Sequence, residues 1–65
     1  MPIVNIHLLE GRPPEKIRHL IANVSKTVSE TLEVPVERVR VLVTEVPHSH
    51  WGVGGQPMSE KKDGQ

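Results

Sequence analysis

A proline in second position is the residue of this sequence that most directly suggests chemistry. Pro2 follows Met1, and a small second residue normally permits removal of the initiator methionine. Pro2 would then present a secondary amine as the chain terminus. Apolar and cationic surroundings would favour the neutral form of such an amine, which could act as a base near physiological pH. The alternative is a proline that begins a strand, where its missing N–H is tolerated.

Two arginines and one tryptophan are the other candidate functional side chains. Arg40 lies between Val39 and Val41, where a charge is costly unless it faces solvent, is paired or binds an anion. Arg12 follows a predicted turn and is either a surface charge or an anion-binding group. Trp51 is the one aromatic residue and precedes a glycine-rich turn. It would be a pocket wall, an interface anchor or a local packing residue.

Several other kinds of site are not expected. His48 and His50 are two residues apart with no third ligand nearby, so we predict no metal site. The absence of cysteine removes thiolate ligands, cysteine nucleophiles and disulfides. The glycines of 52–55 are not followed by the Lys-Ser/Thr and helix of a phosphate-binding loop. The hydroxyl residues of 25–29 lack the base and acid of a hydrolase triad.

The elements that must position these side chains follow from the apolar spacing. The stretch 2–9 is rich in β-branched residues and precedes Gly11 and two prolines, which predicts a strand ending in a turn. Residues 14–32 have helical spacing and 38–46 alternate as a second strand. The helical stripe consists of Ile17, Leu20, Ile21, Val24, Val28, Thr31 and Leu32. Two strands joined through a helix should be parallel, with a right-handed crossover.

The predicted fold class is α/β, in the sense of an α+β chain built on one β-α-β unit. It contains two parallel strands, one long helix and a short hairpin after Pro47. The polar stretch 56–65 is expected to be a flexible tail. The whole chain, 1–65, forms a single domain.

The length and charge of the chain indicate its partners. A 65-residue monomer buries little surface, and one helix covers one face of a sheet, so we expect self-association. Eight basic residues against eight acidic ones argue against nucleic acid as a partner. No apolar run approaches the length of a membrane span, and the N-terminus lacks a signal pattern. We therefore expect no membrane partner and a cytoplasmic location.

Three segments, 2–12, 39–45 and 50–55, together resemble the 4-oxalocrotonate tautomerase family. They read PIVNIHLLEGR, VRVLVTE and HWGVGG, and the spacing between them is also that of the family. The resemblance covers residues 2–55 and implies a homohexamer, a trimer of dimers, with each site drawn from neighbouring subunits. It also implies an isomerase of aromatic hydrocarbon catabolism that acts without a metal or organic cofactor.

The resemblance further implies the role of each site residue. Pro2, exposed by removal of Met1, would take the hydroxyl proton of the dienol 2-hydroxymuconate and return it to carbon 5, giving 2-oxo-3-hexenedioate. Arg12 would hold the distal carboxylate of this dicarboxylate. Arg40 would hold the 2-oxo acid end and stabilise the charge developing on its oxygen. Trp51, where the family more often has Phe, and Leu9 would line the pocket.

Departures from related families leave alternatives open. Related dehalogenases of 3-chloroacrylate have a second arginine and a glutamate where this chain has Leu9 and Val53. Dehalogenation or hydration as the main activity is therefore not expected, although a promiscuous activity of either kind is an alternative. Another dienol, such as 2-hydroxy-2,4-pentadienoate, would suit the same groups. A non-catalytic oligomeric protein that keeps the fold is the third alternative.

Overall fold

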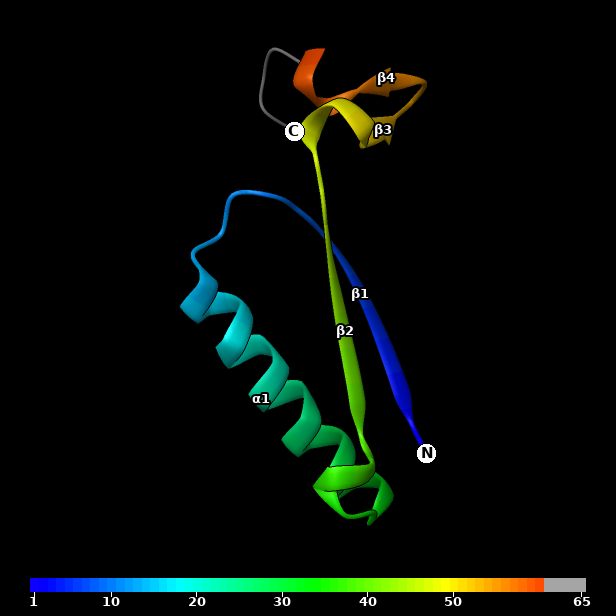
Figure 1. Cartoon of the computed structure of the whole chain (residues 1–65). Helices are drawn as coiled ribbons and strands as arrows, with labels where there is room; N and C mark the ends of the chain where they lie inside the picture. The colour runs from blue at the N-terminus through cyan, green and yellow to red at the C-terminus, as the bar shows by residue number, and fades with distance from the viewer. Residues whose placement is uncertain (61–65) are drawn as a thin grey trace.

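The computed structural model describes residues 1–60 and contains the predicted β-α-β unit (Figure 1). Its principal elements are β1 (Ile3–Leu9), α1 (Pro14–Leu32) and β2 (Arg40–Val46). β1 and β2 pair in parallel, from Ile3 opposite Arg40 to Leu9 opposite Val46. The long helix packs along one side of this two-stranded sheet. The expected fold class, with parallel strands, one long helix and a short C-terminal hairpin, is confirmed.

The ends of α1 follow from local chemistry. Pro13 precedes the helix without a side-chain capping bond, as the sequence predicts, and Pro14 occupies the first helical position. At the other end Glu33 adopts a left-handed conformation (φ 58°), and the Val34 N–H donates to the Ser29 carbonyl at 3.1 Å. The Ser29 hydroxyl also donates to the Val34 carbonyl at 2.6 Å. These bonds end the helix at Leu32, three residues before Pro35, which disfavours helical geometry in the residue before it.

The second strand begins at residue 40, two residues later than the predicted start at residue 38. Val36–Arg38 instead form a single 3-10 turn. The Arg38 N–H donates to the Pro35 carbonyl at 3.0 Å, and the Val39 N–H donates to the Val36 carbonyl at 3.1 Å. These two bonds use backbone groups that a longer strand would present to its neighbour.

The C-terminal segment forms a small unit beyond the end of β2. A 3-10 turn (His48–His50) leads to β3 (Gly52–Val53) and β4 (Gln56–Pro57), which pair antiparallel. Gly54 and Gly55 connect them with φ of 63° and 85°, the conformation that a tight hairpin turn requires. A further 3-10 turn (Met58–Glu60) follows.

The first part of the expected tail, residues 56–60, consists of β4 and the 3-10 turn that follows it. The Met58 N–H donates to the Trp51 carbonyl at 2.7 Å, which ties residues 56–60 into this unit. The remainder of the predicted tail, 61–65, lies outside the described residues.

Very little of the chain is buried. Val39, at 8% exposure, is the one buried hydrophobic residue among residues 1–60. The accessible surface is 5037 Å², against about 4,200 Å² for a compact monomer of this mass. The Cα radius of gyration is 14.9 Å, against about 11 Å for a compact chain. The molecule is thus elongated, with much of its apolar surface uncovered.

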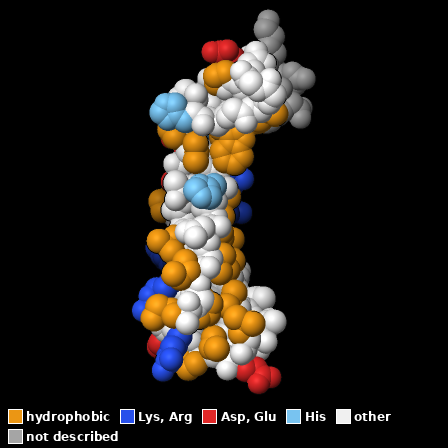
Figure 2. All heavy atoms as spheres, turned by 90° about the vertical axis from the view of Figure 1, so that its right-hand side faces the viewer, with side chains coloured by type: hydrophobic (Ala, Val, Ile, Leu, Met, Phe, Trp, Pro, Cys, Tyr) orange, Lys and Arg blue, Asp and Glu red, His pale blue; other side chains and the backbone are white. Residues whose placement is uncertain are grey.

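The sheet face opposite α1 carries part of this uncovered surface. Along each strand the half-buried residues alternate with exposed ones, and Ile3 and Leu42 are 59% and 51% exposed. Figure 2, which views the molecule at 90° to Figure 1, shows hydrophobic side chains along much of its length. No helix in residues 1–60 is long and apolar enough to cross a membrane.

Candidate active site

Two of the predicted site residues, Pro2 and Arg40, lie together at the N-terminal end of the sheet. The Arg40 N–H donates to the Pro2 carbonyl at 2.9 Å, which continues the ladder between the strands. The Arg40 guanidinium is exposed, and its Nη1 donates to the Glu37 carbonyl at 2.8 Å. Pro2 is half-buried. The parallel register thus brings a cationic residue next to the proline that removal of Met1 would make terminal.

Leu9 and Arg12 lie at the opposite end of β1. Leu9 is half-buried, and its carbonyl accepts a hydrogen bond from Arg12 Nη1 at 3.0 Å. The Glu10 N–H donates to the Val46 carbonyl at 3.0 Å, which keeps the start of the turn against the end of β2. The Arg12 guanidinium is consequently held at the C-terminal end of the two strands.

Trp51 also lies beyond the C-terminal end of β2. It is half-buried at the start of the small C-terminal unit. Its carbonyl accepts the Met58 N–H at 2.7 Å, and its own N–H donates to the His48 carbonyl at 3.4 Å. Figure 1 shows the hairpin that follows Trp51 at the same end of the molecule as the turn after β1.

The predicted site residues therefore form two half-sites in one chain. The Pro2 half-site contains Pro2 and Arg40, and the other half-site contains Leu9, Arg12 and Trp51. Pro2 and Leu9 are seven strand positions apart, or about 23 Å at 3.3 Å per residue. No side chain spans that distance, and residues 1–60 enclose no pocket of their own. A site containing Pro2, Arg40, Arg12 and Trp51 would need residues from more than one copy of the chain.

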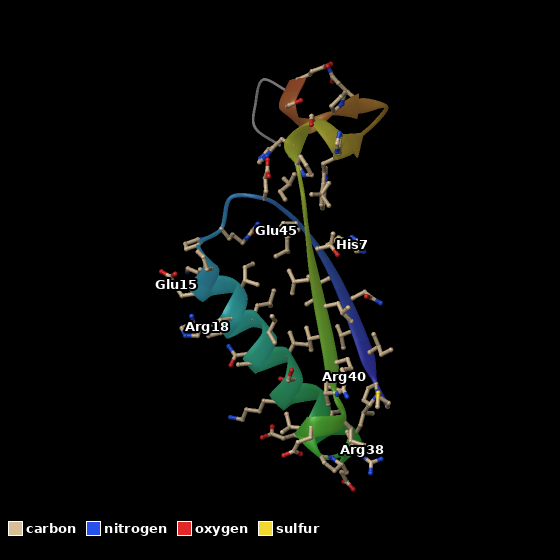
Figure 3. The ribbon with its side chains drawn as sticks, viewed as in Figure 1. His7, Glu15, Arg18, Arg38, Arg40 and Glu45 are labelled. Carbon is tan, nitrogen blue, oxygen red and sulfur yellow. The ribbon has the colours of Figure 1, made fainter. Side chains whose placement is uncertain are left out.

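The described residues offer few groups for other chemistry. Across residues 1–60, no three or more His, Cys, Asp or Glu side chains cluster as metal ligands. His48 and His50 are exposed on their 3-10 turn. Arg38 is not among the site residues predicted from the sequence, but it lies close to Arg40 of the Pro2 half-site (Figure 3). Its spacing of two residues from Arg40 is the signal that could have identified it.

A β-α-β chain with a proline in second position beside an arginine, and with candidate site residues at both ends of its strands, is typical of a tautomerase subunit. The comparison of sequences supports this class directly. The family model described as "Tautomerase enzyme" matches residues 2–61. The chain belongs to this tautomerase family.

Known relatives are similar over nearly the whole chain. A 2-hydroxymuconate tautomerase of Pseudomonas putida is 48% identical over 60 residues, covering 92% of this chain and 95% of the relative. The crystal structure of a 4-oxalocrotonate tautomerase homologue superposes with a TM-score of 0.89 at 42% identity, covering 95% and 98% of the two chains. A heterohexameric 4-oxalocrotonate tautomerase from Chloroflexus aurantiacus has a TM-score of 0.88 at 37% identity, covering 95% and 100%.

Proposed function

We propose that this chain is a 2-hydroxymuconate tautomerase in which Pro2, after removal of Met1, is the general base. The amine of Pro2 takes the hydroxyl proton at carbon 2 of the dienol, and the C2–O bond becomes a carbonyl. The two double bonds are replaced by one between carbons 3 and 4, and carbon 5 accepts the proton back from Pro2. The product, 2-oxo-3-hexenedioate, has the same atoms and electrons as the substrate.

The arginines hold the two ends of this substrate. Arg40 binds the 2-oxo acid end and stabilises the charge that develops on its oxygen, while Arg12 of a different subunit binds the distal carboxylate. A guanidinium binds a carboxylate through two parallel hydrogen bonds, so two separated arginines suit a short dicarboxylate. Leu9 and Trp51 line the pocket between them. Conjugation within the substrate stabilises the intermediate, so no cofactor takes part.

The proposed assembly is a homohexamer, a trimer of dimers. The half-sites at opposite ends of one chain support it, because they become complete when copies meet. Exposed Ile3 and Leu42 on the outer sheet face support it as well, since a second copy would remove their side chains from water. One structural relative is itself described as a heterohexamer. We place the activity in the cytoplasm, in aromatic hydrocarbon catabolism.

The observation that carries the proposal is the hydrogen bond of 2.9 Å between the Arg40 N–H and the Pro2 carbonyl. It fixes the backbone of Pro2 against that of Arg40, the residue that we propose polarises the substrate oxygen. Leu9 and Val53 favour tautomerisation over dehalogenation, because neither side chain can activate water. A different dienol acid, or a promiscuous hydratase or dehalogenase activity, is the second possibility.

The test compares three forms of the protein whose N-termini are verified by intact mass. They are the chain beginning at Pro2, the same chain with one residue retained before Pro2, and Pro2→Ala. Ketonisation of 2-hydroxymuconate is followed by ultraviolet absorbance. We expect the retained residue to lower kcat/KM by at least about 100-fold, because it converts the amine into an amide. Full activity of the blocked chain or of Pro2→Ala would contradict the proposal.

A further inference from the structure

Arg38 and Arg40 lie on the same side of the chain where β2 begins. Val39 stands between them in an extended conformation (φ −87°, ψ 131°) and is buried, at 8% exposure. Side chains alternate along extended backbone. The neighbours of a buried residue therefore point away from the core, and both arginines are exposed.

This arginine pair lies near the start of the chain. Ile3 lies opposite Arg40 in the strand register, and the Arg40 N–H donates to the Pro2 carbonyl at 2.9 Å. Figure 3 shows Arg38 and Arg40 at the end of the sheet where the chain starts. Met1, whose removal would expose the Pro2 amine, is 76% exposed.

The two guanidinium groups differ in their hydrogen bonds. Arg40 uses one Nη1 donor on the Glu37 carbonyl. In the described part of the chain, side-chain hydrogen bonds come from Arg12, Ser29 and Arg40, and none involves Arg38. A guanidinium carries five N–H donors, so Arg38 has its donors available for a ligand.

We propose that Arg38 is a second substrate-binding residue, which acts with Arg40 on the 2-hydroxy acid end of the substrate. The inference rests on the proposed function and specifies its substrate class. This end of the substrate presents three oxygens, two from the carboxylate and one from the reacting hydroxyl. One guanidinium fork pairs with two oxygens, so a second arginine at this end can bind the third. The site therefore selects substrates with a carboxylate directly next to the reacting carbon.

The kinetic test uses two substrates that share this end. 2-Hydroxymuconate has a distal carboxylate, and phenylenolpyruvate has a phenyl ring in its place. We expect Arg38→Gln to raise KM by about tenfold for both substrates, with a smaller change in kcat. Arg12→Gln should raise KM for 2-hydroxymuconate alone. Arg38→Lys, which keeps the charge but not the fork, should fall between Arg38→Gln and the wild type.

The matched control is Arg18→Gln, which removes an exposed arginine of α1 far from this end of the sheet (Figure 3). It should leave both KM values unchanged. Wild-type KM values in Arg38→Gln would overturn the inference, as would an effect confined to the dicarboxylate. A light-scattering mass equal to that of the wild type shows that the variants assemble.

A binding measurement separates this inference from the proposed reaction. Calorimetric titration of the assembled protein with 2-oxoadipate, which has no dienol to convert, reports on the site without turnover. Arg38→Gln should weaken binding of 2-oxoadipate by about tenfold and that of adipate by less. An inactive wild type with Arg38-dependent binding would contradict the tautomerase proposal and support this site. An active wild type whose binding of 2-oxoadipate does not depend on Arg38 would support the tautomerase proposal and contradict the role of Arg38.

Discussion

Arg12 and Arg40 occupy different surroundings, and we expect their removal to have different kinetic effects. Arg40 lies in the ladder beside Pro2, and in the proposed reaction it would face the oxygen on which charge develops. Arg12 lies at the other end of the strands, and there it would hold a carboxylate that does not change during the reaction. A contact strengthened in the transition state affects kcat, whereas one equal in both states affects KM.

We therefore predict that Arg40→Ala lowers kcat by at least about tenfold, because the lost contact is a charge-assisted hydrogen bond. Arg12→Ala should mainly raise KM, by about tenfold or more, with kcat nearly unchanged. Steady-state rates with 2-hydroxymuconate give both parameters. The same change of kcat and KM in both variants would contradict this division of roles.

At the scale of the elements, the C-terminus of α1 contains a strained residue. Glu33 has φ of 58°, a conformation that costs an L-residue about 1–2 kcal/mol and that glycine adopts freely. We predict that Glu33→Gly raises the free energy of unfolding by about 0.5 kcal/mol per chain, after the entropy cost of glycine. Denaturant midpoints at one fixed protein concentration measure the change.

The matched control is Glu30→Gly, which replaces an exposed glutamate within the same helix. Glycine there should destabilise the protein by about 1 kcal/mol, because the position is already helical. Equal losses in both variants would show that the left-handed conformation at Glu33 carries no strain.

The sequence predicts the main elements well because their apolar periods differ. The helix is found at 14–32 as expected, since its stripe repeats at helical spacing. The start of β2 is missed by two residues, because the alternation of the strand continues back through Val39 and Arg38, whereas Arg38 belongs to the 3-10 turn. The site residues are recognisable from their types. Their separation into two half-sites is not, because it depends on the strand register and the direction of the turn after β1.

The whole molecule has the properties of a subunit rather than of a finished protein. Its single helix covers one face of a two-stranded sheet. Among residues 1–60, the fold buries just one hydrophobic residue, Val39. The outer face of that sheet combines exposed Ile3 and Leu42 with the arginines of the Pro2 half-site. Assembly would therefore bury apolar surface and complete the site in one step.

Leu42 provides the test of this assembly. It lies opposite Asn5 in the middle of the sheet and is 51% exposed on the outer face. We predict that Leu42→Glu breaks the assembly into smaller species and abolishes activity, because an unpaired charge in an apolar interface costs several kcal/mol. Sedimentation at micromolar concentration gives the mass.

Asn23→Glu, which adds the same charge to an exposed position of α1, should leave mass and activity unchanged. Leu42→Ala, which keeps the face apolar, should assemble more weakly than the wild type but remain larger than Leu42→Glu. A wild-type mass for Leu42→Glu would show that this face stays open to solvent and that the half-sites meet in another way.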